Sequence, residues 1–136
     1  MTRGVDRRDG GAMALELTWE DVLEVGQGGP GCGLLHINGR QPKGAFRYLP
    51  PAIEHEGLVY AATFVPGGFE LCVIDPESLV RRPLSHRLDY ARLVRVEPEA
   101  LVYVDAYADG EECRWPLAPA APGGLLGRLA ARLRGR

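Results

Sequence analysis

Two stretches decide the fold: EGLVYAATFVPG at residues 56–67 and EALVYVDAYADG at residues 99–110, which echo each other at a spacing of 43 residues. In each stretch a short apolar and aromatic segment leads into a turn that contains glycine, and a second such segment follows. Short strands separated by glycine turns are typical of an antiparallel meander, and self-similarity at a fixed spacing indicates a repeated unit. The two stretches therefore predict an all-β fold with an internal repeat. The matched residues are Glu56, Leu58, Val59, Tyr60, Phe64 and Gly67 with Glu99, Leu101, Val102, Tyr103, Tyr107 and Gly110.

Turn signals on both sides of these stretches extend the pattern. Asn38-Gly39 predicts a tight turn, because both of its central residues need a positive φ, and the sequence DPES at residues 75–78 predicts a type I turn. Residues 40–57 are rich in proline and glycine and are expected to be an irregular excursion, with Phe46 and Tyr48 tucked over the core. Regular spacing of short strands suits a sandwich, or a partly open barrel or propeller-like sheet. The pattern in residues 20–25 is compatible with either a helical turn or a strand. The predicted strands are 14–19, 33–37, 58–64, 69–74, 79–82, 92–96, 101–107 and 112–117.

The chain of 136 residues is long enough for one domain with its own core. We expect residues 13–117 to form a single β domain and residues 1–12 to be a disordered extension, so that Met13 could be the true start. Residues 118–124, APAAPGG, predict a linker. Residues 125–136 place leucines near one helical face and arginines elsewhere, which predicts either a short basic C-terminal helix or a frayed tail.

Charge is segregated along the chain. The net charge is −2, but residues 118–136 carry four arginines and no acid, and residues 12–117 hold 9 basic and 16 acidic residues. An acidic body argues against direct nucleic-acid binding, which needs phosphate contacts from Lys and Arg. It favours a basic protein partner, although acidic surfaces also serve solubility alone.

The three cysteines, Cys32, Cys72 and Cys113, are an odd and dispersed set without a C-x-x-C motif, which predicts reduced thiols and a cytoplasmic location. Residues 1–11 lack the apolar core of a secretory signal, and no apolar run reaches the roughly 18 residues of a membrane span.

No motif predicts catalysis, a cofactor or a metal. Residues 26–31, GQGGPG, match G-x-G-x-x-G but lead into a strand instead of the helix that a dinucleotide site requires. His36, His55 and His86 show no metal-ligand spacing, and the charged group Glu54-His55-Glu56 is expected to be solvated. Cys72 with His86 and an acid such as Asp89 could form a thiolate pair, but a cysteine within a strand is usually a small core residue. We expect a protein that is not an enzyme and binds no cofactor and no metal.

The best recognition candidate is the predicted strand 101–107. Alternation places Val102, Val104 and Ala106 on one face and a Tyr-Asp-Tyr stripe on the other. If the aliphatic face is core, the stripe is exposed and suits an interface hot spot; the alternative is that the tyrosines belong to a second buried face of a sandwich. The predicted partner-binding residues are Tyr103, Asp105, Tyr107, Asp109, Glu111 and Glu112.

Residues 19–117 resemble small bacterial immunity proteins of polymorphic toxin loci, through the GQGGP loop, the ING turn, the IDPES turn and the tyrosine-rich meander. The resemblance implies a protein that binds a cognate toxin and covers its active site, and it assigns no binding residues. One alternative is a propeller-like repeat module. The other is a small-molecule-binding β-barrel or an enzyme, and the absence of a convergent polar cluster in the sequence argues against this second alternative.

Overall fold

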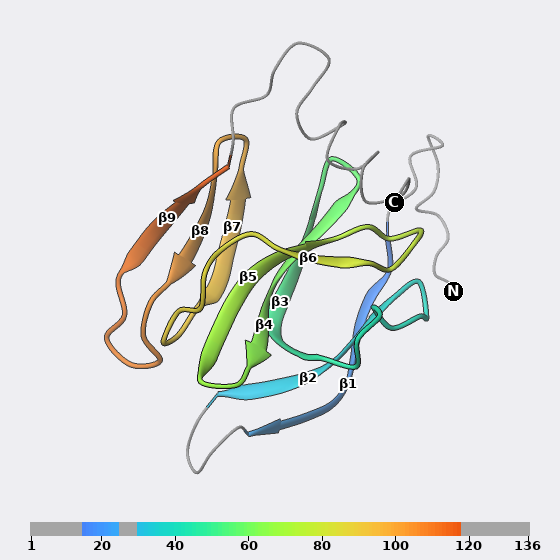
Figure 1. Ribbon diagram of the computed structural model, residues 1–136, viewed down its shortest axis with the longest axis horizontal. Helices are drawn as coiled ribbons and strands as arrows, with labels where there is room; N and C mark the ends of the chain where they lie inside the picture. The colour runs from blue at the N-terminus through green and yellow to red at the C-terminus, as the bar shows by residue number, and fades with distance from the viewer. Residues whose placement is uncertain (1–14, 25–29, 118–136) are drawn as a thin grey trace.

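The computed structural model describes residues 15–24 and 30–117, and these form an all-β, antiparallel fold of two open sheets (Figure 1). The larger sheet has the order β1-β2-β3-β4-β5-β6, and the smaller has the order β7-β8-β9. The strands are β1 (Leu17–Glu24), β2 (Gly31–Ile37), β3 (Arg47–His55), β4 (Leu58–Val65), β5 (Gly68–Ile74), β6 (Arg81–Pro83), β7 (Arg92–Glu97), β8 (Ala100–Val104) and β9 (Glu112–Pro116). The all-β prediction is confirmed, and the predicted C-terminal helix and tail lie outside the described residues.

Two hydrophobic clusters lie on opposite faces of β4 and β5. The inter-sheet cluster fills the space between β4–β5 and the three-stranded sheet and includes Tyr60, Leu71 and Leu101. The second cluster lies under β1–β2 and includes Val59 and Cys72. Alternate residues of β4 and β5 therefore enter different clusters, and this is why almost every residue of these strands is buried.

The two echoing stretches occupy equivalent places in the two sheets. Residues 58–65 form β4 and residues 100–104 form β8, each the middle strand of a three-stranded antiparallel run. Leu58 and Tyr60 from β4 meet Leu101 and Tyr103 from β8 in the inter-sheet cluster. Whether the two runs descend from one repeated unit stays a prediction.

The expectation that residues 40–57 are irregular is wrong for β3. Arg47–His55 is a strand that pairs with β4 on both sides of a register shift between Leu49 and Ile53. Pro50 and Pro51 lie within that shift, where no ladder hydrogen bond is required of them. Tyr48 is buried at 1% exposure, as predicted, and the partly buried ring of Phe46 packs on the second cluster.

Other element boundaries also differ from the sequence expectation. Residues 20–24 continue β1 as a strand, with a bulge at which Asp21 has a φ of 60°. The turn after β5 extends to Leu79, whose amide donates to the Asp75 carbonyl at 2.7 Å, so β6 begins only at Arg81. β8 ends at Val104 instead of residue 107. The tight turn at residues 38–39 is confirmed, with the flanking residues hydrogen-bonded to each other.

Candidate protein-binding surface

The loop of residues 105–111, which we call the acidic loop, joins β8 to β9 and is held by its first residue. The Asp105 carboxylate accepts a hydrogen bond from the Glu111 amide at 3.1 Å and faces the Cys113 thiol at 3.4 Å. The Asp105 amide donates to the Glu111 carbonyl at 3.3 Å. The backbone hydrogen bond from Glu111, assisted by the Cys113 thiol, lowers the pKa of Asp105. The carboxylate is therefore ionised at neutral pH and closes the loop directly after the end of β8 at Val104.

Tyr107 in the acidic loop is 61% exposed and is backed by a row of aromatic rings. Its ring lies 6.1 Å from that of Tyr90, which lies 5.3 Å from Phe69, which in turn lies 5.5 Å from Phe64. Tyr90 and Phe69 are buried, whereas Phe64 is 37% exposed. The row therefore runs from the exposed ring of Tyr107 through two buried rings to the exposed ring of Phe64, and each exposed ring packs against a buried one.

Tyr103, predicted as a partner-binding residue, is buried. It is 8% exposed and belongs to the inter-sheet cluster, so the alternative of a second buried face holds for this tyrosine. Burial raises the pKa of Tyr103, and the neighbouring Cys113 thiol adds to the effect. The expectation of a continuous exposed Tyr-Asp-Tyr stripe is therefore wrong, and only Asp105 and Tyr107 of the three face solvent.

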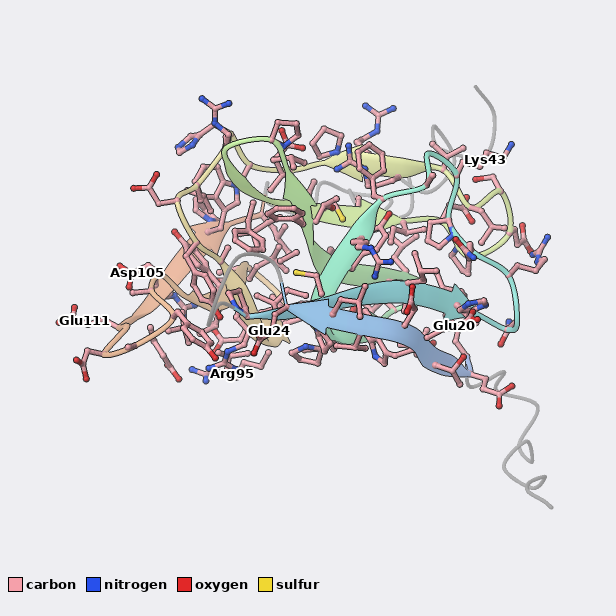
Figure 2. The ribbon with its side chains drawn as sticks, turned by 90° about the horizontal axis from the view of Figure 1, so that it is seen from below. Glu20, Glu24, Lys43, Arg95, Asp105 and Glu111 are labelled. Atoms are coloured by element: carbon pink, nitrogen blue, oxygen red, sulfur yellow. The ribbon has the colours of Figure 1, made fainter. Side chains whose placement is uncertain are left out.

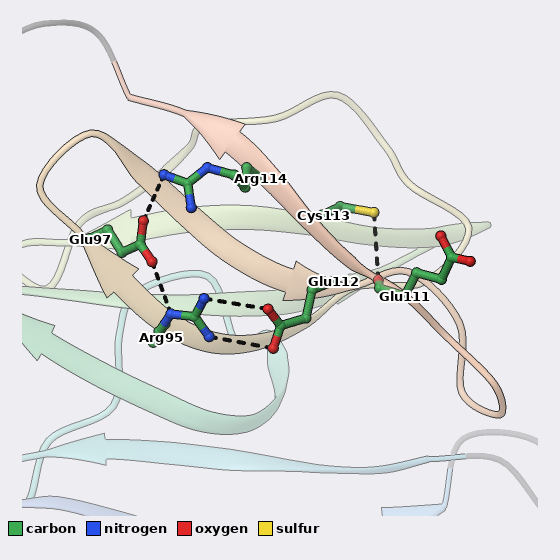
Figure 3. Close-up of polar contacts among 6 residues, drawn as sticks. All are labelled: Arg95, Glu97, Glu111, Glu112, Cys113 and Arg114. Atoms are coloured by element: carbon green, nitrogen blue, oxygen red, sulfur yellow. Dashed lines mark hydrogen bonds and ion pairs between the residues drawn. The ribbon is translucent and has the colours of Figure 1, made fainter.

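Glu112, another predicted partner-binding residue, is engaged in an ion-pair network on the outer face of the small sheet (Figure 3). Its two carboxylate oxygens each lie 3.4 Å from a guanidinium nitrogen of Arg95. Arg95 also contacts Glu97 at 2.9 Å, and Glu97 contacts Arg114 at 2.6 Å. The register places Arg95 and Arg114 on either side of Val102, which explains why this outward valine is only 1% exposed. Glu112 thus has a structural role within the sheet.

The remaining carboxylates of the acidic loop are free to meet a partner. Asp109 and Glu111 are exposed, and neither forms an ion pair within the described residues. Asp105 and Glu111 project together at one end of the molecule (Figure 2). The structure thus groups Asp105, Tyr107, Asp109 and Glu111 of the six predicted residues on one exposed loop, whereas Tyr103 is core and Glu112 is paired. Sequence reasoning missed Tyr90 and Phe69 as supports, because their contacts join segments far apart in the chain.

The other candidate sites stay apart. Cys72 is fully buried and accepts a hydrogen bond from the Thr63 hydroxyl at 3.0 Å, and burial raises its pKa to about 11. His86 packs instead on Trp115, with ring centroids 5.1 Å apart. The thiol of Cys72 is therefore protonated at neutral pH, as expected of a core residue.

The remaining histidines form local pairs. His36 lies 2.8 Å from a Glu20 oxygen, and His55 lies 3.8 Å from Glu56. The described residues contain no group of three or more His, Cys, Asp or Glu side chains able to hold a metal ion, and all three cysteines are free. In the described part of the chain, no helix has the length and apolar character needed to cross a membrane. The glycine motif of residues 26–31 lies largely outside the described residues.

Comparison with protein-family models, with curated proteins and with solved structures finds no match for this chain.

Proposed function

We propose that this chain is a non-catalytic protein-binding module of the cytoplasm, and that it acts as an immunity-type protein. In this proposal the acidic loop covers the basic active-site cleft of a cognate toxin and blocks access to it. The observation that carries the proposal is Tyr107, an aromatic side chain that is 61% exposed yet backed by Tyr90, between carboxylates that have no ion-pair partner among the described residues.

Two physical properties support this use of the loop. Tyrosines at the centre of an interface are frequent hot spots, because a rigid ring buries much area at little entropic cost. The Asp105 clamp fixes the loop before any partner arrives, which reduces the ordering cost of binding. The body of the chain, residues 12–117, has 16 acidic against 9 basic residues, which would steer a basic partner toward it.

The test is a titration calorimetry measurement of the full chain against the purified product of the gene immediately upstream. We expect a stoichiometric complex that Tyr107→Ala weakens by at least about 30-fold, the effect of a hot spot of about 2 kcal/mol. Asp109→Arg, tested as a separate variant, should also weaken the complex, because it places a cation against the basic cleft. Raising the salt from about 0.1 M to about 1 M should reduce affinity, because the Debye length falls from about 10 Å to about 3 Å.

Glu99→Arg is the matched control, since Glu99 is an exposed acid in the turn before β8, at the opposite end of that strand from the acidic loop. It makes the same change in net charge as Asp109→Arg and should leave affinity within about threefold of wild type. An absent complex would contradict the immunity proposal. Equal losses of affinity in Asp109→Arg and Glu99→Arg would show that the net charge of the chain, and not the acidic loop, determines binding.

A further inference from the structure

Arg81, on the short edge strand β6, carries a guanidinium that is mostly buried but incompletely bonded. Its side chain is 12% exposed. Nη1 donates to the Thr63 hydroxyl and to a Glu70 carboxylate oxygen, both at 3.3 Å. Phe46 lies against the flat face of the guanidinium, 4.2 Å from ring centroid to Cζ. Three contacts therefore hold the orientation of this cation.

These contacts leave one edge of the guanidinium unused. Nε is buried and has no hydrogen-bond partner in the described part of the chain. Nη2, on the same edge, makes no hydrogen bond with another described residue and is not among the buried unpartnered atoms. The Nε–Nη2 edge is one of the two edges through which arginine can bind a carboxylate with two parallel hydrogen bonds. The guanidinium is therefore fixed in orientation and has an unpartnered Nε–H that is closed to solvent, so a carboxylate can reach this edge only if its cover moves.

A second unpartnered donor accompanies Arg81. Tyr48 is 1% exposed, and its hydroxyl has no hydrogen-bond partner among the described residues. The register places Tyr48 beside Thr63, and Thr63 beside Glu70, so Tyr48 shares a cross-strand row with the two residues that Nη1 of Arg81 contacts. Burial raises the pKa of the Tyr48 phenol, the Arg81 cation lowers it by less, and the phenol therefore stays protonated as a donor. Buried donors without acceptors are rare in native structures, so two in one cluster require an explanation.

The cover over this cluster is a short, strained segment. Phe46 follows Gly44, with a φ of 101°, and Ala45, with a φ of 55°. Positive φ is costly for alanine, and such strain recurs at ligand clamps. Lys43, the only lysine of the chain, lies on the same segment and projects into solvent (Figure 2).

We propose that Arg81 and Tyr48 form a binding site for a carboxylate group, which the Nε–Nη2 edge of Arg81 holds by two hydrogen bonds and the Tyr48 hydroxyl holds by a third. Glu70 and Thr63 are positioning residues that hold Nη1, and Phe46 covers the guanidinium. The site lies on the face of the large sheet turned away from the small sheet, so it is separate from the acidic loop and independent of the proposed function.

The test is an NMR titration of the full chain with sodium acetate, with sodium chloride used to keep the ionic strength constant. The Arg81 Nε–H resonance reports binding directly. We expect a saturable shift with a dissociation constant in the millimolar range, about tenfold weaker in Tyr48→Phe, which removes one hydrogen bond. Arg81→Lys keeps the charge but loses the fork, and saturation should be lost when the Phe46 amide is followed instead. Arg82→Lys, at an exposed neighbour on β6, is the control and should bind like wild type.

The variants differ from wild type by one hydroxyl or by a change of cation, and the dispersion of their amide spectra shows whether they fold. A linear shift without saturation, or the same response to chloride alone, would overturn the proposal. So would unchanged acetate binding in both Tyr48→Phe and Arg81→Lys. A tripeptide with a free carboxyl end that binds more tightly than acetate and than its own amide would identify a chain terminus as the source of the carboxylate; equal affinity of tripeptide and acetate would identify a free acid.

Discussion

Replacing Tyr103 by alanine should destabilise the fold strongly, and the same change at Tyr107 should not. Tyr103 is 8% exposed in the inter-sheet cluster, whereas Tyr107 is 61% exposed. Removing a buried aromatic ring costs about 3–5 kcal/mol, and a surface substitution usually stays within about 0.5 kcal/mol. For a domain of about 100 residues, a loss of about 3 kcal/mol corresponds to a decrease in Tm of at least about 12 °C.

The assay is urea unfolding followed by tryptophan fluorescence. Trp115 reports on the small sheet because it lies on β9, where its indole N–H donates to the Leu84 carbonyl at 3.1 Å. Trp19 on β1 also contributes to the emission. We expect Tyr103→Ala to lower the midpoint with little change in slope, and Tyr107→Ala to superimpose on wild type. An unfolding free energy for Tyr103→Ala within about 1 kcal/mol of wild type would refute the assignment of this tyrosine to the core and restore it as a binding residue.

Three further predictions concern the backbone, the thiols and pH. Gly68→Ala should cost about 3 kcal/mol in unfolding free energy, because a Cβ there would overlap a backbone carbonyl of the segment before β7. Gly57→Ala is the control, since Gly57 has a φ of 83° but lies in open space, and it should cost only about 1 kcal/mol. Equal costs for the two variants would contradict the overlap at Gly68. Iodoacetamide should alkylate the partly exposed Cys113 before Cys72, whose buried thiol has a pKa of about 11; equal labelling of the folded protein, measured by mass spectrometry, would argue against this core. Because the pKa of Asp105 is lowered, its clamp stabilises the acidic loop fully above about pH 4, and this stabilisation is lost as the pH falls through the native pKa. Amide hydrogen exchange in the acidic loop of wild type should therefore accelerate over that pH range. In Asp105→Asn the exchange rate, corrected for intrinsic exchange, should not depend on pH.

The sequence was sufficient to predict the strands that are buried on both sides. β4 and β5 are near-continuous apolar runs between clear turns, such as Pro66-Gly67, and local pattern alone defines them. β3 escaped prediction because Pro50 and Pro51 usually interrupt a strand. Here a register shift in the pairing of β3 with β4 accommodates them, and the proline pattern alone does not predict such a shift.

The candidate site could be predicted only in part, for a related reason. In β8 both Val102 and Tyr103 are buried, one beneath charged side chains and the other between the sheets. Alternation separates the two faces of a strand but does not show which of them meets a second sheet. The acidic residues of the loop could be recognised from sequence, whereas the pairing of Glu112 with Arg95 depends on cross-strand register.

The junction between β2 and β3 has a consequence for how the molecule opens. Only Gly33 and Tyr48 pair there, so a single step of backbone ladder joins β1–β2 to the rest of the large sheet. Side-chain packing in both clusters and the hydrogen bonds from Arg47 to Asp21 and to the Cys32 carbonyl supply the rest of the attachment. Backbone pairing is therefore sparse at this point, and we expect β1–β2 to detach more readily than β4 and β5 separate from each other. Such a detachment would bring Cys72 and its neighbours into contact with water without global denaturation.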